Sequence, residues 1–523
     1  MPDYLKALIV VVVLAAVVFR IAAPYLSGWT TDRSDFRRRV GVWFGVTIAL
    51  FAANDFWLFI LIAAPLLAFG GIKDRNPLAF YCALLCAAPT FGSEVSGLGL
   101  INYFFELNYL RLLSLVVLFP AAWRLFMNRS ERLRGPKLPD VLLLAYLVLL
   151  FILTALGAPF TTALRQAFYL FIDVWLLYYV ASRSVRDIAT FRDVVAAFVL
   201  GATVMAVLAI FEAVRVWLLY STLDQHLGVT WGMGNYLGRG AGGPLRAMAS
   251  TGHPIVMGYL MVVAIPLLMF LKPAIRSRFI FWLCLSVLVV ALVATLSRGP
   301  WIGGVAMALV VAGLGRGAFK RFGLLGLGVG VVSGLALMTD FGRSLFSFLP
   351  FVGTVGSESI EYRQRLFEVS LGILWQSPFF GVPGFYANAA AQELRGVEGI
   401  IDVVNSYIGV AVSSGVVGLS LFVGLFACAG ILAWRTRSAA KADPQAADMA
   451  NSLLATIAAI LVTIATASSI GIIAHSYFMV AGIAIGCCGE YLARTARVHS
   501  PAPTSQAGPG PAPLGRPARA GGG

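Results

Sequence analysis

The sequence has 523 residues, of which 59% are hydrophobic and only 12% charged, and its mean hydropathy is +0.86. A water-soluble surface cannot carry this composition, which excludes a soluble enzyme and a cytosolic nucleic-acid-binding protein. The apolar residues fall in blocks of about 18 or more, the length at which a helix spans a bilayer. The predicted fold class is therefore an all-α, polytopic membrane bundle, and the net charge of +15 indicates basic cytoplasmic loops.

The apolar runs and the polar segments between them predict about fifteen helices, of which about twelve to fifteen cross the membrane. In chain order they are expected at residues 5–26, 40–53, 56–70, 77–89, 108–126, 140–157, 165–181, 193–219, 253–271, 279–296, 300–315, 322–338, 405–434, 451–470 and 474–492. Two of them, 40–53 and 77–89, are short for a full span.

The connecting segments alternate in charge, and this alternation predicts their sides. Lys and Arg gather in every second segment: 27–39, 71–76, 127–139, 182–192, 272–278, 316–321 and 435–450. These segments belong in the cytoplasm, because loops that stay there retain basic residues. The two long loops, 220–252 and 339–403, belong outside, and the second holds seven acidic residues against four arginines.

This topology divides the chain into four parts. Residues 1–338 are expected to form an N-terminal transmembrane bundle that includes the outer loop 220–252, and residues 339–403 form the long outer loop. Residues 404–492 add the C-terminal transmembrane helices. Residues 493–523 are expected to be a disordered cytoplasmic tail, since their Pro/Ala/Gly-rich sequence cannot bury a core.

The six cysteines all lie inside apolar runs and lack the spacing of a zinc or redox centre. No metal and no cofactor is therefore expected. Charged residues in the middle of predicted spans are few, and Arg20, Asp173 and Glu212 are the exceptions.

Arginines concentrate on the outer side, where positive charge is otherwise depleted. The planar guanidinium fork binds phosphate oxygens in a bidentate manner and stays charged at any relevant pH. These arginines are predicted either to bind an anion together or to pair singly with lipid headgroups and loop carboxylates. They are Arg239 and Arg246 in the first long loop, Arg298 between two helices, and Arg343, Arg363, Arg365 and Arg395 in the second long loop.

Arg298 is the most informative of these arginines. It lies in the tripeptide Ser-Arg-Gly between two apolar runs with almost no loop, near the edge of the hydrocarbon. An unpaired charge in hydrocarbon costs about 2.5 kcal/mol or more. An anionic partner is therefore expected, either a carboxylate such as Glu361 or Glu368 or a lipid phosphate.

Two further outer features are candidates for a site. The segment EYRQRLFEVSLGILWQSPFFGVPGFYANAA predicts an amphipathic helix that ends in a Pro/Gly-rich turn at residues 377–384. It would lie on the membrane surface beside a headgroup site or serve as a plain surface cap. His253 opens the span HPIVMGYLMVVAIPLL, and His475 begins the last span. Each is a candidate substrate contact or a simple helix-start residue.

The order of four segments resembles the O-antigen ligase and polysaccharide polymerase superfamily, with its WaaL-type ligases and Wzy-type polymerases. The segments are TGHPIVMGYLMVVAIPLL, TLSRGPWIGGVAMALV, the long-loop segment above and VVNSYIGVAVSSGVVGLSLFVGL, within roughly residues 190–435. The resemblance implies a GT-C-like glycosyltransferase of the bacterial inner membrane with a periplasmic active face. It implies transfer of a saccharide from a polyprenyl diphosphate carrier to an acceptor sugar without a metal ion.

Carried over by residue, the resemblance assigns Arg298 to the family's Ser-Arg-Gly element, and Arg363 or Arg365 to the arginine of the long-loop helix. Arg239 and Arg246 join them as candidate diphosphate contacts. Asn405 and Tyr407 would contact the acceptor, within the element His-Asn-x-Tyr/Leu of the family. Val404 stands where many members place the histidine, which weakens the ligase reading and leaves the base open. The candidates for the base are Glu361, Glu398, Asp402 and His253.

Three functions compete. The favoured one is a polymerase that joins lipid-linked repeat units into an exopolysaccharide, capsule or O-antigen. The alternatives are a ligase that transfers glycan to a lipid or protein acceptor, and a flippase for lipid-linked oligosaccharide, which mid-span charges would favour. The expected partners are the polyprenyl-diphosphate-linked oligosaccharide, an acceptor glycan, membrane lipid and other polysaccharide-assembly proteins, with no nucleic acid.

Overall fold

The computed structural model describes residues 1–26, 31–99, 101–128, 137–229, 244–315, 317, 320, 322–324, 326–328, 338–339, 357–393, 395, 401 and 403–499. Of the predicted site residues, Arg239, Glu398 and Asp402 lie outside this part of the chain, as do Arg343 and most of the helix expected at 322–338.

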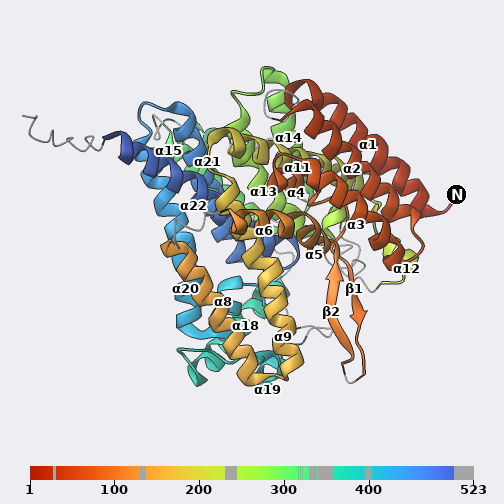
Figure 1. Cartoon of the computed structure of the whole chain (residues 1–523), viewed down its shortest axis with the longest axis vertical. Helices are drawn as coiled ribbons and strands as arrows, with labels where there is room; N and C mark the ends of the chain where they lie inside the picture. The colour runs from red at the N-terminus through yellow and green to blue at the C-terminus, as the bar shows by residue number, and fades with distance from the viewer. Residues whose placement is uncertain are drawn as a thin grey trace, which may run out of the picture.

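The described residues are almost entirely helical (Figure 1). The longer helices are α1 (Asp3–Leu26), α2 (Arg33–Ala52), α3 (Phe56–Lys73), α8 (Leu138–Gly157), α11 (Ile188–Arg215), α13 (Pro254–Leu271), α14 (Arg278–Ala294), α15 (Arg298–Leu314), α18 (Ser357–Gln376), α20 (Ser406–Ala439), α21 (Pro444–Ile464) and α22 (Ile472–His499). The shorter ones are α4 (Pro77–Leu84), α5 (Tyr109–Leu113), α6 (Phe119–Met127), α9 (Phe160–Tyr169), α10 (Leu176–Ser184), α12 (Leu223–Leu227) and α19 (Ala389–Gln392). Two π-helical segments, η1 (Ser114–Leu118) and η2 (Leu170–Trp175), and two 3-10 turns, η4 (Ala249–Thr251) and η5 (Phe385–Ala387), are also present.

Within the described residues, nine helices are long and apolar enough to cross a membrane, and α14 and α15 are shorter apolar helices. The predicted all-α polytopic class is confirmed. Several predicted boundaries differ from the structure: the short helix expected at 40–53 begins seven residues earlier, at Arg33, and the one expected at 77–89 ends at Leu84. The π-helical segment η2 joins α9 and α10 into one continuous helix that is longer than predicted.

A β-hairpin was not predicted. Strands β1 (Gly92–Ser96) and β2 (Tyr103–Asn108) pair antiparallel, with Gly92 opposite Asn108 and a bulge between Glu94 and Ser96. The hairpin projects from the bundle at the same end as α18 and α19 (Figure 1). It was missed because its alternation of exposed and partly buried residues extends over only a few positions.

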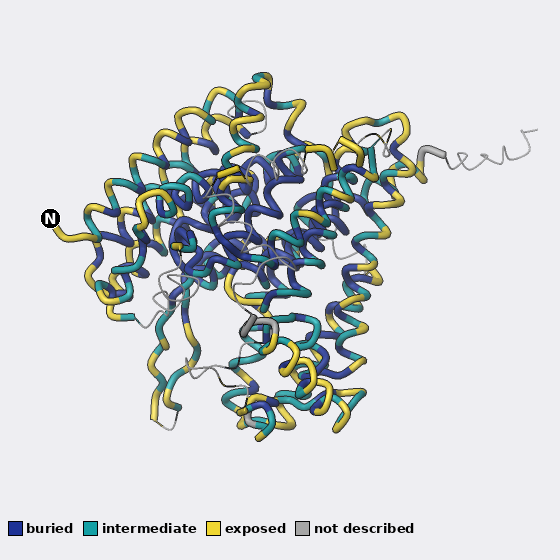
Figure 2. The backbone as a smooth tube through the Cα atoms, turned by 180° about the vertical axis from the view of Figure 1, so that it is seen from behind, coloured by how far each residue is buried: buried dark blue, intermediate teal, exposed yellow. Residues whose placement is uncertain are grey.

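The core is formed by helices that are buried on nearly all sides. Most of the apolar length of α11, α13 and α22 is buried, whereas α1 and α8 leave most of theirs exposed. Figure 2 shows the buried backbone in the middle of the bundle and the exposed backbone around it. An apolar face that is exposed in a polytopic bundle is expected to meet lipid, so α1 and α8 lie at the periphery.

A second, smaller apolar cluster lies beyond the bundle. It is formed by α18, η5, α19 and residues 403–414, which we call the cap, and its buried residues include Leu366, Ile373, Phe385 and Val412. We name the end of the bundle that carries it the cap end. The opposite end, where α2, α11 and α14 begin among basic residues, is the basic end.

The cap is joined to the bundle at a break in α20. Gly415 adopts φ 66° and ψ −170°, so the helix is interrupted there. The turn that follows α18 fills the break: the Val382 N–H donates to the Val412 carbonyl at 2.7 Å, and the Val416 N–H donates to the Pro378 carbonyl at 2.9 Å. A Cβ on residue 415 would lie 2.1 Å from the Phe379 carbonyl oxygen, so only glycine fits this contact.

Candidate functional site at the cap end

A buried carboxylate organises the loop that carries Arg246. Glu212 is fully buried near the end of α11. It accepts backbone N–H groups from Leu219 at 3.1 Å, Met248 at 3.0 Å and Ala249 at 2.8 Å. Ala249 has a φ of 45°, a conformation that costs a non-glycine residue of order 1–3 kcal/mol. The hydrogen bonds to Glu212 hold the loop in this conformation.

Arg246 joins this loop to the turn before α15. Its Nε donates to the Thr295 carbonyl at 3.4 Å, and its Nη2 donates to the Ser297 Oγ at 2.9 Å. Leu296, between those two partners, has a φ of 47°. Backbone outliers of this kind cluster at functional sites. The contacts bring Arg246 next to the Ser-Arg-Gly element, in which Arg298 is the first residue of α15.

The turn between α21 and α22 lies against the same element. A Cβ on Gly299 would lie 2.6 Å from the Thr466 Oγ1, so glycine permits this close approach. Arg363 of α18 reaches the same turn, where its Nη2 donates to the Thr466 carbonyl at 3.3 Å. Arg246, Arg298 and Arg363, which come from three separate segments, therefore converge around Thr295–Gly299 and Thr466.

The start of α20 is fastened to this turn as well. The Asn405 side chain caps α20 by accepting the N–H groups of Tyr407 at 2.9 Å and Ile408 at 3.2 Å. Ser406 Oγ donates to the Ala467 carbonyl at 2.8 Å, and Ser469 Oγ donates to Ser406 Oγ at 2.7 Å. Asn405 and Tyr407, predicted as acceptor contacts, thus lie beside the converging arginines, and Asn405 has a structural role there.

The turn at residues 465–471 was missed as part of the site. Its sequence is Ala-Thr-Ala-Ser-Ser-Ile-Gly, and the run of small hydroxyl residues between two apolar helices was the available signal. Its backbone carbonyls accept hydrogen bonds from Arg363 and Ser406. Such contacts link segments far apart in the chain, and no local pattern predicts them.

Two predicted residues of α18 lie away from the arginines. Glu361 and Arg365 are exposed, whereas Arg363 is partly buried against the turn at Thr466. Since each helical residue is rotated about 100° from the one before, residues two apart point in nearly opposite directions. Of the two arginines carried over as alternatives, Arg363 is the one at the cap-end cluster.

The His253 side chain caps the start of α13. Its Nδ1 accepts the Ile255 N–H at 3.1 Å, at the start of α13. Burial and the Arg246 guanidinium lower the pKa of His253 to about 3. At neutral pH the ring is therefore uncharged, and an occupied Nδ1 acceptor places the remaining proton on Nε2. In this arrangement His253 can donate a hydrogen bond, and it must leave the cap in order to accept a proton at Nδ1.

Val404 packs against the apolar cluster of the cap, beside Val403 and Ile408. At the position where the resemblance predicts a histidine, the chain thus carries a side chain that cannot transfer a proton. No group of three or more His, Cys, Asp or Glu residues that could hold a metal ion occurs in the described part of the chain.

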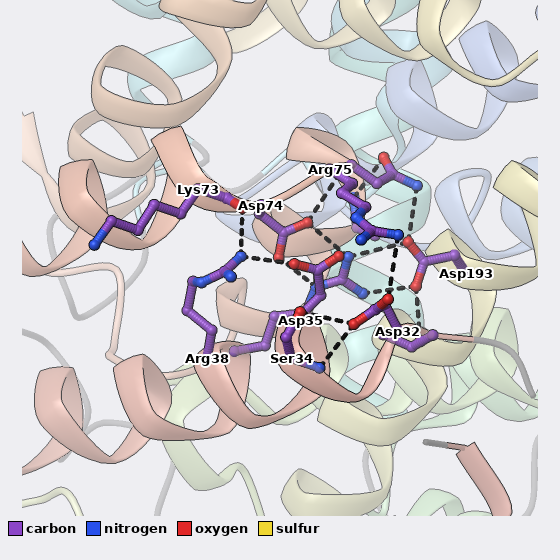
Figure 3. Close-up of polar contacts among 12 residues, drawn as sticks. Asp32, Ser34, Asp35, Arg38, Lys73, Asp74, Arg75 and Asp193 are labelled. Atoms are coloured by element: carbon purple, nitrogen blue, oxygen red, sulfur yellow. Dashed lines mark hydrogen bonds and ion pairs between the residues drawn. The ribbon is translucent and has the colours of Figure 1, made fainter. Parts of the chain in front are cut away.

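A second polar cluster lies at the basic end and is built differently (Figure 3). Arg39 of α2 pairs with Asp74 at 2.8 Å and with Asp193 of α11 at 2.7 Å, and its side chain is buried. Asn76 and Thr31 donate to the same Asp193 carboxylate at 3.1 and 2.7 Å. The cluster fastens α2, the α3–α4 connection and α11 together.

A third polar cluster fixes the hairpin to the bundle. Arg111 pairs with Asp173 of η2 at 3.0 Å, donates to the Glu106 carbonyl at 2.7 Å and lies 3.8 Å from the centroid of the Tyr169 ring. The His475 Nε2 lies 3.4 Å from the other Asp173 oxygen. Asp173, an exception within the predicted spans, is therefore paired, and His475 lies in this cluster.

Comparison with known proteins supports the reading of the central segment. The family model described as O-antigen ligase matches residues 279–423, which include the Ser-Arg-Gly element, α18 and the start of α20. No curated protein matches the chain. The predicted resemblance to the O-antigen ligase and polymerase superfamily is confirmed over the matched residues, and it supports a membrane function of the ligase or polymerase type.

Proposed function

We propose that the chain is a GT-C-like, metal-independent membrane glycosyltransferase that polymerises polyprenyl-diphosphate-linked oligosaccharide repeat units. The observation that carries the proposal is the convergence of Arg246, Arg298 and Arg363 at one end of the bundle. Two of them are oriented by uncharged oxygens: Arg246 by Thr295 and Ser297, and Arg363 by Thr466. The planar guanidinium fork binds phosphate oxygens in a bidentate manner, which is the recognition that a diphosphate carrier requires.

The chemistry needs little covalent assistance. The acceptor hydroxyl attacks the anomeric carbon, the bond to the diphosphate oxygen breaks, and the lipid diphosphate leaves with the bonding electrons. Arginines placed before the reaction stabilise the charge that develops on the leaving group, an effect of several kcal/mol in a low-dielectric site. A single displacement inverts the anomeric centre.

The acceptor hydroxyl also needs a base, and we propose a carboxylate. Glu398 and Asp402 are the nearest candidates in the chain to Asn405, and Glu361 on the exposed side of α18 is the third. His253 is the weaker candidate because its Nδ1 caps α13. We expect Glu398→Gln or Asp402→Asn to abolish transfer while the donor still binds, since the amide keeps the shape and loses the basicity.

The ligase is the alternative, because the matching family model is described as O-antigen ligase. Val404 in place of the family histidine favours the polymerase. Purified protein incubated with lipid-linked repeat units distinguishes the two functions: a ladder of products supports the polymerase, and a single transfer to an added acceptor supports the ligase. Movement of intact donor across a vesicle membrane without any transfer would instead indicate a flippase.

We propose further that the chain lies in the bacterial inner membrane with the cap end in the periplasm, as the alternation of basic loops predicts. Single cysteines at Leu98 and Tyr386, both exposed near the cap end, should react with a membrane-impermeant thiol reagent in spheroplasts. Cysteines at Lys73 and Arg435, at the basic end, should not react. The opposite pattern would place the arginine cluster in the cytoplasm and contradict a periplasmic reaction.

A further inference from the structure

A deep apolar groove opens on the side of the bundle, far from the arginine cluster. It has a volume of about 190 Å³ and is formed by α1, α11, α13 and α14, with Val17, Ile21, Val199, Leu268, Leu283 and Val287 among its lining residues. Thr203, one of its few polar lining residues, donates to the Val199 carbonyl at 2.8 Å and lies 3.3 Å from the Cys284 sulfur. The lining of the groove is therefore almost entirely apolar and suits an apolar ligand.

The groove is near the basic end and open to the periphery. It is lined by the last residues of α13, whereas His253 and the arginine cluster lie at the first. At 1.5 Å per residue, Leu268 is about 20 Å along the helix axis from Pro254. Val17 and Leu283 line the groove and remain 51% and 41% exposed, so the groove opens on the face that meets lipid.

Basic residues surround the basic end of the groove. Arg20 is exposed on α1 next to the lining residue Ile21, and Lys272, Arg276 and Arg278 are exposed in and beside the connection between α13 and α14. The sequence contains no acidic residue between 4 and 26 or between 254 and 294. The two segments therefore bring basic residues, with no acidic residue of their own, to a pocket that accepts an apolar chain.

We infer that this groove binds an acyl chain of an anionic phospholipid of the bilayer, with the lipid phosphate held by Lys272, Arg278 and Arg20. Basic pockets between transmembrane helices select anionic headgroups, and the apolar lining accounts for the chain. The occupant is a bilayer lipid rather than the lipid-linked donor, because the diphosphate of the donor is expected at the cap end. The inference rests on the groove and its charge, and only the exclusion of the lipid-linked donor rests on the proposed function.

The test measures the lipid that remains bound to the purified, full-length protein. Native mass spectrometry and lipid extraction of protein in mild detergent should find one phosphatidylglycerol-type lipid per chain. Added phosphatidylglycerol should exchange with the bound lipid, whereas added phosphatidylcholine should not. Lys272→Gln and Arg278→Gln should each lower retention about fivefold, as expected for one basic residue near a headgroup. Arg435→Gln, at the same end but away from the groove, should have no effect.

A paired substitution tests the groove itself. Val17→Phe combined with Val287→Phe fills it, and Val13→Phe combined with Val290→Phe places the same rings on the same helices outside it. We expect the first pair to lose the lipid and the second to keep it. Equal retention by both pairs would overturn the inference, as would recovery of a prenyl lipid or equal retention of phosphatidylcholine. The glutamine variants leave the lining intact, so they test the headgroup contacts even if the filled protein folds poorly.

Discussion

Arginine is used in two ways at the two ends of this bundle. At the basic end, Arg39 is buried between the carboxylates of Asp74 and Asp193. At the cap end, Arg246 and Arg363 donate to backbone carbonyls and a serine hydroxyl. The two carboxylates neutralise the guanidinium of Arg39, and the ion pairs link α2 to the α3–α4 connection and to α11. At the cap end, the hydrogen bonds hold the two guanidinium groups beside the Ser-Arg-Gly element. The comparison distinguishes an arginine that links helices through buried ion pairs from the arginines that we propose to bind a diphosphate.

The largest effect is expected at the basic end. Arg39→Ala leaves two carboxylates without their partner in the interior, which costs about 3–5 kcal/mol. Arg75→Ala is the control, since the Arg75 side chain is 76% exposed and its pairing with Asp32 is worth at most about 1 kcal/mol. Thermal unfolding in detergent, followed by size-exclusion chromatography, measures both. If Arg39→Ala lowers the stability no more than the control does, the buried cluster does not stabilise the packing of these helices.

Arg298→Lys should impair transfer without impairing the fold. Lysine keeps the charge and loses the bidentate fork, and loss of one preorganised donor typically lowers kcat about a hundredfold or more. Product formation from lipid-linked repeat units gives the rate, and the melting temperature is expected to stay close to that of the parent. An Arg298→Ala protein that is folded and fully active would remove this residue from the site.

Arg363 and Arg365 offer a matched pair on one helix. Arg363→Gln should lower the rate about tenfold or more, because this side chain reaches Thr466 beside the Ser-Arg-Gly element. Arg365→Gln should change it little, since Arg365 is exposed on the other side of α18. The two variants have the same charge and the same helix propensity. Equal losses would mean that net charge near the cap, rather than a directed guanidinium, supports the reaction.

The smallest effect concerns the dependence of stability on pH at His253. Its pKa is about 3 in the folded protein, below the ordinary value of 6.5, so the unfolded chain takes up the proton first as the pH falls. The contribution of His253 to stability is therefore complete above about pH 6.5 and declines as the pH falls toward 3. His253→Asn keeps a capping side chain and removes the titration. Its melting temperature should fall less than that of the parent between pH 7 and pH 5, and equal falls would contradict the assignment.

Much of the fold was predictable because membrane helices are encoded locally. The run of apolar residues that forms α13, the Ser-Arg-Gly start of α15 and the turn after α18 are all legible in short segments. What could not be predicted depends on contacts between distant residues. Glu212 was visible as a charge within a span, but nothing in the sequence shows that it accepts three N–H groups from two other segments. The choice between Arg363 and Arg365 likewise needed the position of the turn at Thr466.

The break at Gly415 has a consequence for engineering. The cap has its own apolar cluster, and it meets the bundle at the break beside Gly415 and at the turn at residues 465–471, which Arg363 and Ser406 contact. A chimera that exchanges residues 357–414 as a block would therefore keep the cluster intact, whereas a cut inside α18 would divide it.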